Sequence, residues 1–175
     1  MRRSTAAVGS ALFFLLAPGV VVGLIPWALT HWQVREPLPY WEPARVLGWV
    51  VLLAALIALV GAFVRFVVEG LGTPAPLAAP ERLVVGGAYR HVRNPMYVAV
   101  VAAIVGQGLV LGRLGLVVYA GITWLLVAGF VRFYEEPALA SRFGADYEAY
   151  RRAVPAWWPR LRAWEPDGPD EPGAG

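Results

Sequence analysis

Four long runs without any Asp, Glu, Arg or Lys alternate with polar segments along this chain. They cover residues 6–30, 46–64, 94–112 and 114–131. A bilayer core takes about 20 helical residues, and backbone groups in lipid must pair within their own segment. Each run therefore predicts a transmembrane helix. Because Arg113 alone separates the last two runs, we expect them to form a tight hairpin.

The first run is longer than the apolar part of a signal peptide, which favours a retained helix. Pro18 and Pro26 predict that this helix is kinked or ends early, since proline removes a backbone hydrogen bond. The expected fold is all-α: a polytopic membrane protein with about four transmembrane helices and a short cytosolic helical segment near the C-terminus.

The polar segments suggest a division of the chain into three parts. Residues 1–70 hold the first two predicted helices and are assigned to the acceptor, residues 71–164 form the predicted cofactor-binding core, and residues 165–175, rich in Pro, Gly and acids, form a disordered tail. Within the core, residues 73–80 are proline-rich, residues 83–89 have a short β-like pattern, and residues 132–164 are expected to form one or two helices beside the membrane.

Composition narrows the possible functions. The chain is 58% hydrophobic and 15% charged, with no cysteine and no lysine. Soluble domains carry about 25% charged residues, so an ordinary soluble protein is excluded. Thiol catalysis and lysine Schiff-base chemistry are excluded as well. His31 and His91 have no neighbouring His or Cys, which argues against a metal site, and no basic soluble face predicts binding to nucleic acid.

Arginine is distributed unevenly between the two sides of the predicted membrane. Twelve of the 15 arginines lie before residue 6, in residues 65–93 or after residue 131, whereas Arg35, Arg45 and Arg113 lie in the other connections. By the positive-inside rule, both termini are expected in the cytoplasm of a bacterial-type inner (plasma) membrane, with membrane lipids as partners. The inner aromatic belt would then contain Trp157, Trp158 and Trp164.

Two polar clusters are predicted to meet at the cytosolic end of the hairpin. One comprises residues 89–97, and the other comprises Glu135 and Glu136 at the exit of the fourth run. Separately, Asn94 and Pro95 could serve as a helix cap, the arginines as headgroup anchors, and the glutamates as their ion-pair partners. Together they exceed what capping needs, which favours a ligand site.

Three linked motifs carry a resemblance to a known family. Residues 87–97 read GAYRHVRNPMY, residues 135–139 read EEPAL, and residues 143–150 read FGADYEAY. In order and spacing they resemble the motifs of the isoprenylcysteine carboxyl methyltransferase family, which is related to the membrane phospholipid N-methyltransferases. Ala88 stands where that family usually has Pro, and Asn94 stands where it has His.

The resemblance implies a methyltransferase that binds S-adenosyl-L-methionine and modifies a lipophilic acceptor, without a metal. Carried over by motif, Glu135, Glu136 and Arg93 are the candidate catalytic residues. The implied cofactor pocket comprises Tyr89, Arg90, Arg93, Asn94, Pro95, Tyr97, Glu135 and Glu136. Arg151 and Arg152 are assigned to closing the pocket or holding an anionic acceptor.

Other functions remain open from the sequence. An NADPH-dependent membrane reductase of the sterol type would share a similar ligand site but would need more helices. A small transporter or structural membrane protein would place an ionisable residue at mid-bilayer, and the four runs contain none. The acceptor, the choice between O- and N-methylation, the individual roles of the two glutamates and the oligomeric state are not determined by these patterns.

Overall fold

The computed structural model describes residues 17–70 and 83–165, and within these residues every regular element is a helix. The main helices are α2 (Ile25–Thr30), α3 (Glu42–Gly70), α4 (Pro95–Leu111), α5 (Leu114–Phe130) and α6 (Glu136–Ala153). A 3-10 turn, η2 (Gly87–Arg90), and two π-helical turns, η1 (Gly19–Leu24) and η3 (Val131–Glu135), complete them. The all-α prediction is therefore confirmed for the described residues.

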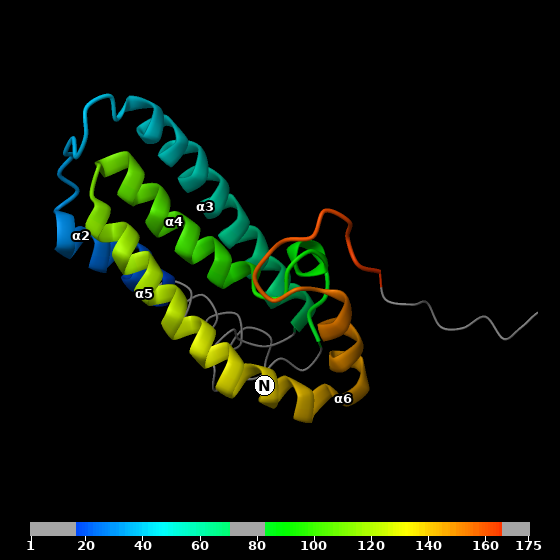
Figure 1. Cartoon of the computed structure of the whole chain (residues 1–175). Coiled ribbons are helices and arrows are strands. Elements are labelled where there is room, and N and C mark those ends of the chain that lie inside the picture. The colour runs from blue at the N-terminus through cyan, green and yellow to red at the C-terminus, as the bar shows by residue number, and fades with distance from the viewer. Residues whose placement is uncertain (1–16, 71–82, 166–175) are drawn as a thin grey trace, which may run out of the picture.

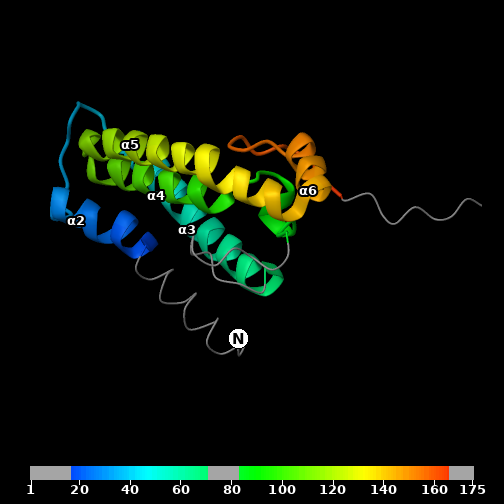
Figure 2. The ribbon, with the colours of Figure 1, turned by 90° about the horizontal axis from the view of Figure 1, so that it is seen from below.

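Helices α3, α4 and α5 lie side by side as an elongated bundle, and α4 packs against both of its neighbours (Figures 1 and 2). We call the end with the α4–α5 turn the closed end. The open end is the one where α4 begins and α5 passes through η3 into α6. The predicted hairpin is thus present.

Within residues 17–70 and 83–165, two helices are long and apolar enough to cross a membrane, Glu42–Arg65 and the continuous helix Leu114–Ala153, whereas Gly19–Thr30 and Pro95–Leu111 are shorter apolar helices. Four spans therefore stay a prediction, and residues 6–16 of the first expected span lie outside the described residues. The outer faces of α3 and α5 expose large apolar side chains, such as Ile57 and Leu126. This is the arrangement expected of helices that face lipid.

Close packing of α3 against α4 depends on glycine at two facing positions. A Cβ on Gly48 would lie 2.8 Å from the Val110 nitrogen, and a Cβ on Gly106 would lie 2.8 Å from the Leu52 nitrogen. Neither backbone could yield without moving its helix. Small residues at such contacts let helix backbones approach, which supplies much of the packing energy available within a membrane.

Pro26 explains the irregular start of the described chain. Without an amide hydrogen it cannot donate to the carbonyls four and five residues earlier, those of Val22 and Val21. Side chains of the bundle take over: the Gln107 Nε2 donates to the Val22 oxygen at 2.8 Å, and the Tyr119 hydroxyl donates to the Val21 oxygen at 3.0 Å. The expected kink is present as the π-helical turn η1, with Gln107 as its polar brace.

At the closed end, the carbonyls that finish α4 receive donors from the preceding chain. Trp41 Nε1 donates to the Leu109 oxygen at 2.8 Å and Arg45 Nε to the Val110 oxygen at 3.2 Å, while the Arg35 amide donates to the Leu111 oxygen at 2.8 Å. Gly112 then turns the chain in the left-handed region, with φ 63°. A Cβ there would lie 2.0 Å from the Arg35 oxygen, so the turn requires glycine.

The structure corrects the β-like prediction for residues 83–89 and contains a helix within residues 132–164. The β-like pattern of residues 83–89 forms no strand: residues 83–85 are irregular, and Gly87, at φ 56°, begins the turn η2. Its lack of a side chain leaves room for Arg65, whose Cγ would lie 3.2 Å from a Cβ. The predicted helix in residues 132–164 is α6, which kinks at Gly144 (φ 52°). The predicted proline-rich connector and the tail from residue 166 lie outside the described residues.

Candidate functional site

Three segments bring polar side chains together at the open end. Residues 89–94 enter α4, which begins at Pro95, where a missing amide hydrogen costs nothing. Facing them, the helix that started as α5 passes through the π-helical turn η3, which contains Glu135, and continues as α6 from Glu136. Such π-turns shift the register of a helix face and are frequent at functional sites. Charged residues recur from Arg132 onward, so this part lies beyond the apolar span.

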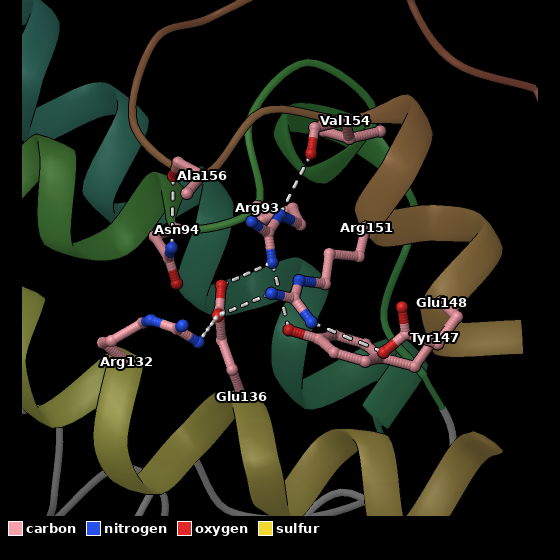
Figure 3. A network of polar contacts seen from close by, with 9 residues as sticks. All are labelled: Arg93, Asn94, Arg132, Glu136, Tyr147, Glu148, Arg151, Val154 and Ala156. Carbon is pink, nitrogen blue, oxygen red and sulfur yellow. Dashed lines mark hydrogen bonds and ion pairs between the residues drawn. The ribbon is translucent and has the colours of Figure 1, made fainter. Parts of the chain in front are cut away.

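The centre of the site is an ion pair between Arg93 and Glu136. Arg93 Nη1 lies 2.7 Å from Glu136 Oε1 and also donates to the Tyr147 hydroxyl at 3.1 Å (Figure 3). Both charged side chains are almost enclosed, with 11% and 10% of their surface exposed. Arg93 Nε donates to the Val154 oxygen at 3.0 Å, so the guanidinium is oriented from two directions. A buried pair needs such added hydrogen bonds to offset the cost of desolvation.

Two further arginines reach the other oxygen of Glu136. Arg132 Nη1 lies 3.7 Å and Arg151 Nη2 lies 3.9 Å from Glu136 Oε2 (Figure 3). Both are more exposed than Arg93, and Arg151 shares its guanidinium with Glu148 at 3.5 Å. Three cations therefore surround one buried carboxylate, and two of them remain accessible to an anion from solvent.

Next to the Arg93–Glu136 ion pair, Tyr97 and Glu135 form a second polar contact. The Tyr97 hydroxyl donates to Glu135 Oε2 at 3.1 Å, which joins the first turn of α4 to η3. Burial raises the pKa of the Glu135 carboxyl above its usual range; the hydrogen bond from Tyr97 opposes this rise, and the charge of Glu136 adds to it. The two adjacent glutamates thus differ: Glu136 is held by arginines, whereas Glu135 is held by a neutral donor.

Residues 154–165, which we call the strap, cover the Arg90–Asn94 loop after α6 ends. The amides of Arg93, Arg160 and Trp164 donate to the oxygens of Pro155, His91 and Arg90 at 2.9, 3.0 and 2.9 Å. Below the strap, burial raises the pKa of the Tyr150 hydroxyl, which donates to the Tyr89 oxygen at 2.7 Å. The strap is therefore part of the fold around the site rather than a loose end.

Asn94 joins the strap instead of capping the helix. It occupies the N-cap position of α4, but its side chain makes no capping hydrogen bond; its Nδ2 donates to the Ala156 oxygen at 3.1 Å. The interpretation of Asn94 as a side-chain cap is therefore wrong. Only 8% of the Asn94 surface is exposed. Its side-chain amide binds the strap and does not cap the helix.

The remaining predicted residues are placed around this centre, and their roles in binding a cofactor stay predictions. Pro95 is buried at the start of α4, and Tyr89 packs with Ala62 and Val84 in a buried cluster. Arg90 points to the strap, where its Nε donates to the Trp164 oxygen and its Nη2 donates to Glu165 Oε1, each at 2.7 Å. Arg152 is exposed, and its side chain makes no hydrogen bond or ion pair within the described part of the chain.

Two residues that the structure places at the centre are not among the predicted catalytic, cofactor-binding or substrate residues. Tyr147 accepts from Arg93, and Arg132 approaches Glu136. Tyr147 belongs to the third motif, so the motif itself was the available signal. Arg132 lies four residues before Glu136, a spacing at which helical side chains meet.

Comparisons with known proteins match the segments that form this site. A family model described as phospholipid methyltransferase matches residues 45–146, from the start of α3 into α6. A curated relative from Bradyrhizobium diazoefficiens, methanethiol S-methyltransferase 2, is 30% identical over 158 residues. The match covers 77% of this chain but 56% of the relative, so the chain spans little more than half of that protein's length. The motif resemblance is confirmed at the level of the family.

Proposed function

This chain belongs to the phospholipid methyltransferase family, and from that premise we propose that it transfers a methyl group from S-adenosyl-L-methionine to a lipophilic acceptor at the membrane. The observation that carries the proposal is the buried Arg93–Glu136 pair, to which three separate segments contribute. An ion pair of this kind is expensive to bury for stability alone. It lies, moreover, inside the segment that the family shares.

The charged and polar side chains at the open end match the chemical groups of the cofactor. Its amino-acid carboxylate requires cations, which the accessible Arg132 and Arg151 supply beside the enclosed Arg93. Its ammonium and ribose hydroxyls require acceptors, for which the carboxylates of Glu135 and Glu136 are the candidates. The Tyr97 ring next to Glu135 offers a face that attracts a sulfonium. When bound, the cofactor supplies an electrophilic methyl group.

We assign different tasks to the two glutamates. Glu136, fixed by Arg93, orients the polar cluster, because its position is determined by charge and by hydrogen bonds. Glu135 is the candidate proton acceptor, because a carboxyl with a raised pKa is a better base near neutral pH. A thiol or an amine acceptor would pass its proton to Glu135 as it is methylated, whereas a carboxylate acceptor would need no base.

The surroundings of Glu135 fit an apolar acceptor. The Phe130 and Tyr134 rings stack with centroids 5.2 Å apart on the turn that carries Glu135, and Tyr134 is 53% exposed. The exposed apolar face of α5 leads to this point from the membrane. We propose that the acceptor approaches along α5 and that both termini, with the open end, lie on the cytoplasmic side of the plasma membrane, the side that supplies the cofactor.

The first test is calorimetric titration of the detergent-purified protein with S-adenosylhomocysteine, the product of methyl transfer, with NADPH as the control ligand. Micromolar binding of the product alone supports the proposal. Binding of NADPH alone would contradict it and favour a reductase. Binding of neither by folded protein would leave the open-end cluster with a structural role.

A small thiol is a second candidate acceptor, favoured by the name of the Bradyrhizobium relative. Transfer of labelled methyl groups should be measured with methanethiol, an S-prenylcysteine and phosphatidylethanolamine in parallel. A lipophilic acceptor predicts labelling of one of the last two. Labelling of methanethiol alone would replace the lipophilic acceptor with the thiol.

A further inference from the structure

The strap carries apolar side chains that the fold itself does not bury. Trp158 is 81% exposed and Leu161 is 100% exposed, although both belong to a segment held by backbone hydrogen bonds on either side. Exposing a large apolar side chain to water is unfavourable, so such a side chain on an ordered loop is expected to contact an apolar partner. The hydrogen bonds fix which way these side chains face.

The position of the strap along the axis of the bundle indicates that this partner is lipid. Trp157 contacts Trp124 of α5 edge to face, with ring centroids 6.2 Å apart. Trp124 lies seven residues before Val131, where the apolar run ends, which is a distance of about 10 Å along a helix. The strap therefore reaches back from the polar end of α5 to the level of its exposed apolar face. Trp158 follows Trp157 directly in this segment, and Leu161 lies four residues after Trp157.

The charges of the strap favour a negatively charged surface. Arg162 of the strap and Arg152, near the end of α6, are exposed, while the acidic Glu165 is 2.7 Å from Arg90. Arg160 donates to the Ala153 oxygen at 2.7 Å and is thereby committed to the fold. Two accessible arginines thus flank two exposed apolar side chains, the combination typical of segments that lie in the headgroup region of anionic lipid.

From these observations we infer that the strap is a membrane-binding element: Trp158 and Leu161 enter the boundary between headgroups and acyl chains, and Arg152 and Arg162 contact anionic phospholipid. The inference does not depend on the proposed methyl transfer. It has a consequence for the site, because the strap that contacts lipid is the same segment whose carbonyls accept hydrogen bonds from Arg93 and Asn94.

The chain has no cysteine, so a single introduced cysteine carries a spin label at one defined position. We would label Leu161→Cys in nanodiscs of phosphatidylcholine and measure collisions with oxygen, which concentrates in lipid, and with a water-soluble nickel chelate. Ile122→Cys on the exposed face of α5 is the lipid reference, and Asp146→Cys on the exposed face of α6 is the water reference. Leu161 is fully exposed, so its replacement removes no internal contact.

We expect the label at position 161 to behave as at position 122, with oxygen collisions exceeding those of the chelate several-fold. A label that behaves as at position 146 would overturn the inference, as would exclusion of both reagents, which would indicate a protein partner. Adding phosphatidylglycerol should deepen the label at 161, and Arg162→Gln should reduce that shift. An unchanged depth with phosphatidylglycerol would overturn the part assigned to charge.

Discussion

The two ends of the bundle use arginine in different ways. At the closed end, Arg45 and Arg113 donate to backbone oxygens: Arg45 to Val110 and Arg113 Nε to Gln33 at 2.9 Å. The acids nearest Arg45, Glu36 and Glu42, are 72% and 70% exposed. At the open end, Arg93 is paired with a carboxylate that is 10% exposed.

The difference separates arginines that complete the fold from one that can bind a ligand. Donation to carbonyls satisfies the end of a helix, and the charge of Arg45 is met by the exposed carboxylates of Glu36 and Glu42. Cations clustered around a buried carboxylate hold a charge arrangement that a zwitterionic ligand can join. Removing an arginine should therefore lower stability at either end, but it should weaken ligand binding only at the open end.

The largest expected effect comes from Arg93→Ala. It leaves the buried Glu136 carboxylate without its 2.7 Å partner, and breaking such a pair costs about 3–5 kcal/mol. We expect binding of S-adenosylhomocysteine to weaken by more than about a hundredfold in calorimetry. Arg113→Ala at the closed end is the matched control and should bind normally with a lower melting temperature. Equal affinities in the two variants would remove the distinction between the ends.

Gly112→Ala should produce the largest loss of stability at the closed end. Its φ of 63° and the 2.0 Å approach to the Arg35 oxygen together should cost about 2 kcal/mol or more. Gly115→Ala, only three residues later, meets nothing within 4 Å in α5 and should be neutral or stabilising. Unfolding in a denaturing detergent series measures both. A stable Gly112→Ala variant would mean that the turn can adopt another conformation.

Asn94→Ala tests whether the open end depends on the strap. Losing the hydrogen bond to the Ala156 oxygen should cost about 1 kcal/mol, felt locally. Hydrogen exchange of the amides of Arg93 and Trp164 should accelerate, measured by mass spectrometry. Ser141→Ala, which removes an exposed hydrogen bond to the Ala138 oxygen, should leave exchange in the strap unchanged. Unaltered exchange in Asn94→Ala would show that the backbone contacts suffice.

Glu135→Gln should have the smallest effect on stability, visible as a change in its pH dependence. Because burial raises the pKa of Glu135 above 4.5, the folded chain keeps a proton that the unfolded chain loses as pH rises. Stability contributed by this group is thus lost on raising pH from 4.5 through the folded pKa. Glutamine cannot titrate, so the melting temperature of the variant should decline less over this range. Glu36 is an exposed carboxylate at the closed end, so the melting temperature of Glu36→Gln should depend on pH as that of the parent does. The same pH dependence in Glu135→Gln would mean that the burial of Glu135 has no effect on its titration.

Much of the fold is local and could be predicted from the sequence. The uncharged runs predict α3, α4 and α5 within a few residues, Arg113 marks the hairpin, and Pro26 predicts the irregular first helix. These features depend on residues close in sequence, where apolar length and missing amide hydrogens have the same effect in any surroundings. The sequence also indicated that Arg93, Tyr97 and the glutamates would meet, since a hairpin brings its two open ends together.

Which partner each side chain takes was decided by the tertiary structure. Arg90 and Arg93 are three residues apart and chemically identical, yet Arg90 pairs with Glu165 of the strap and Arg93 pairs with Glu136 of α6. Asn94 reads as a cap but holds Ala156, 62 residues later. Such pairings depend on how α6 and the strap return over the bundle, a long-range geometry that neither hydrophobic period nor spacing encodes. The sequence by itself determined the helices and the family; packing decided which charges became neighbours, because a charged side chain is stabilised by whatever the fold brings within a few ångströms of it.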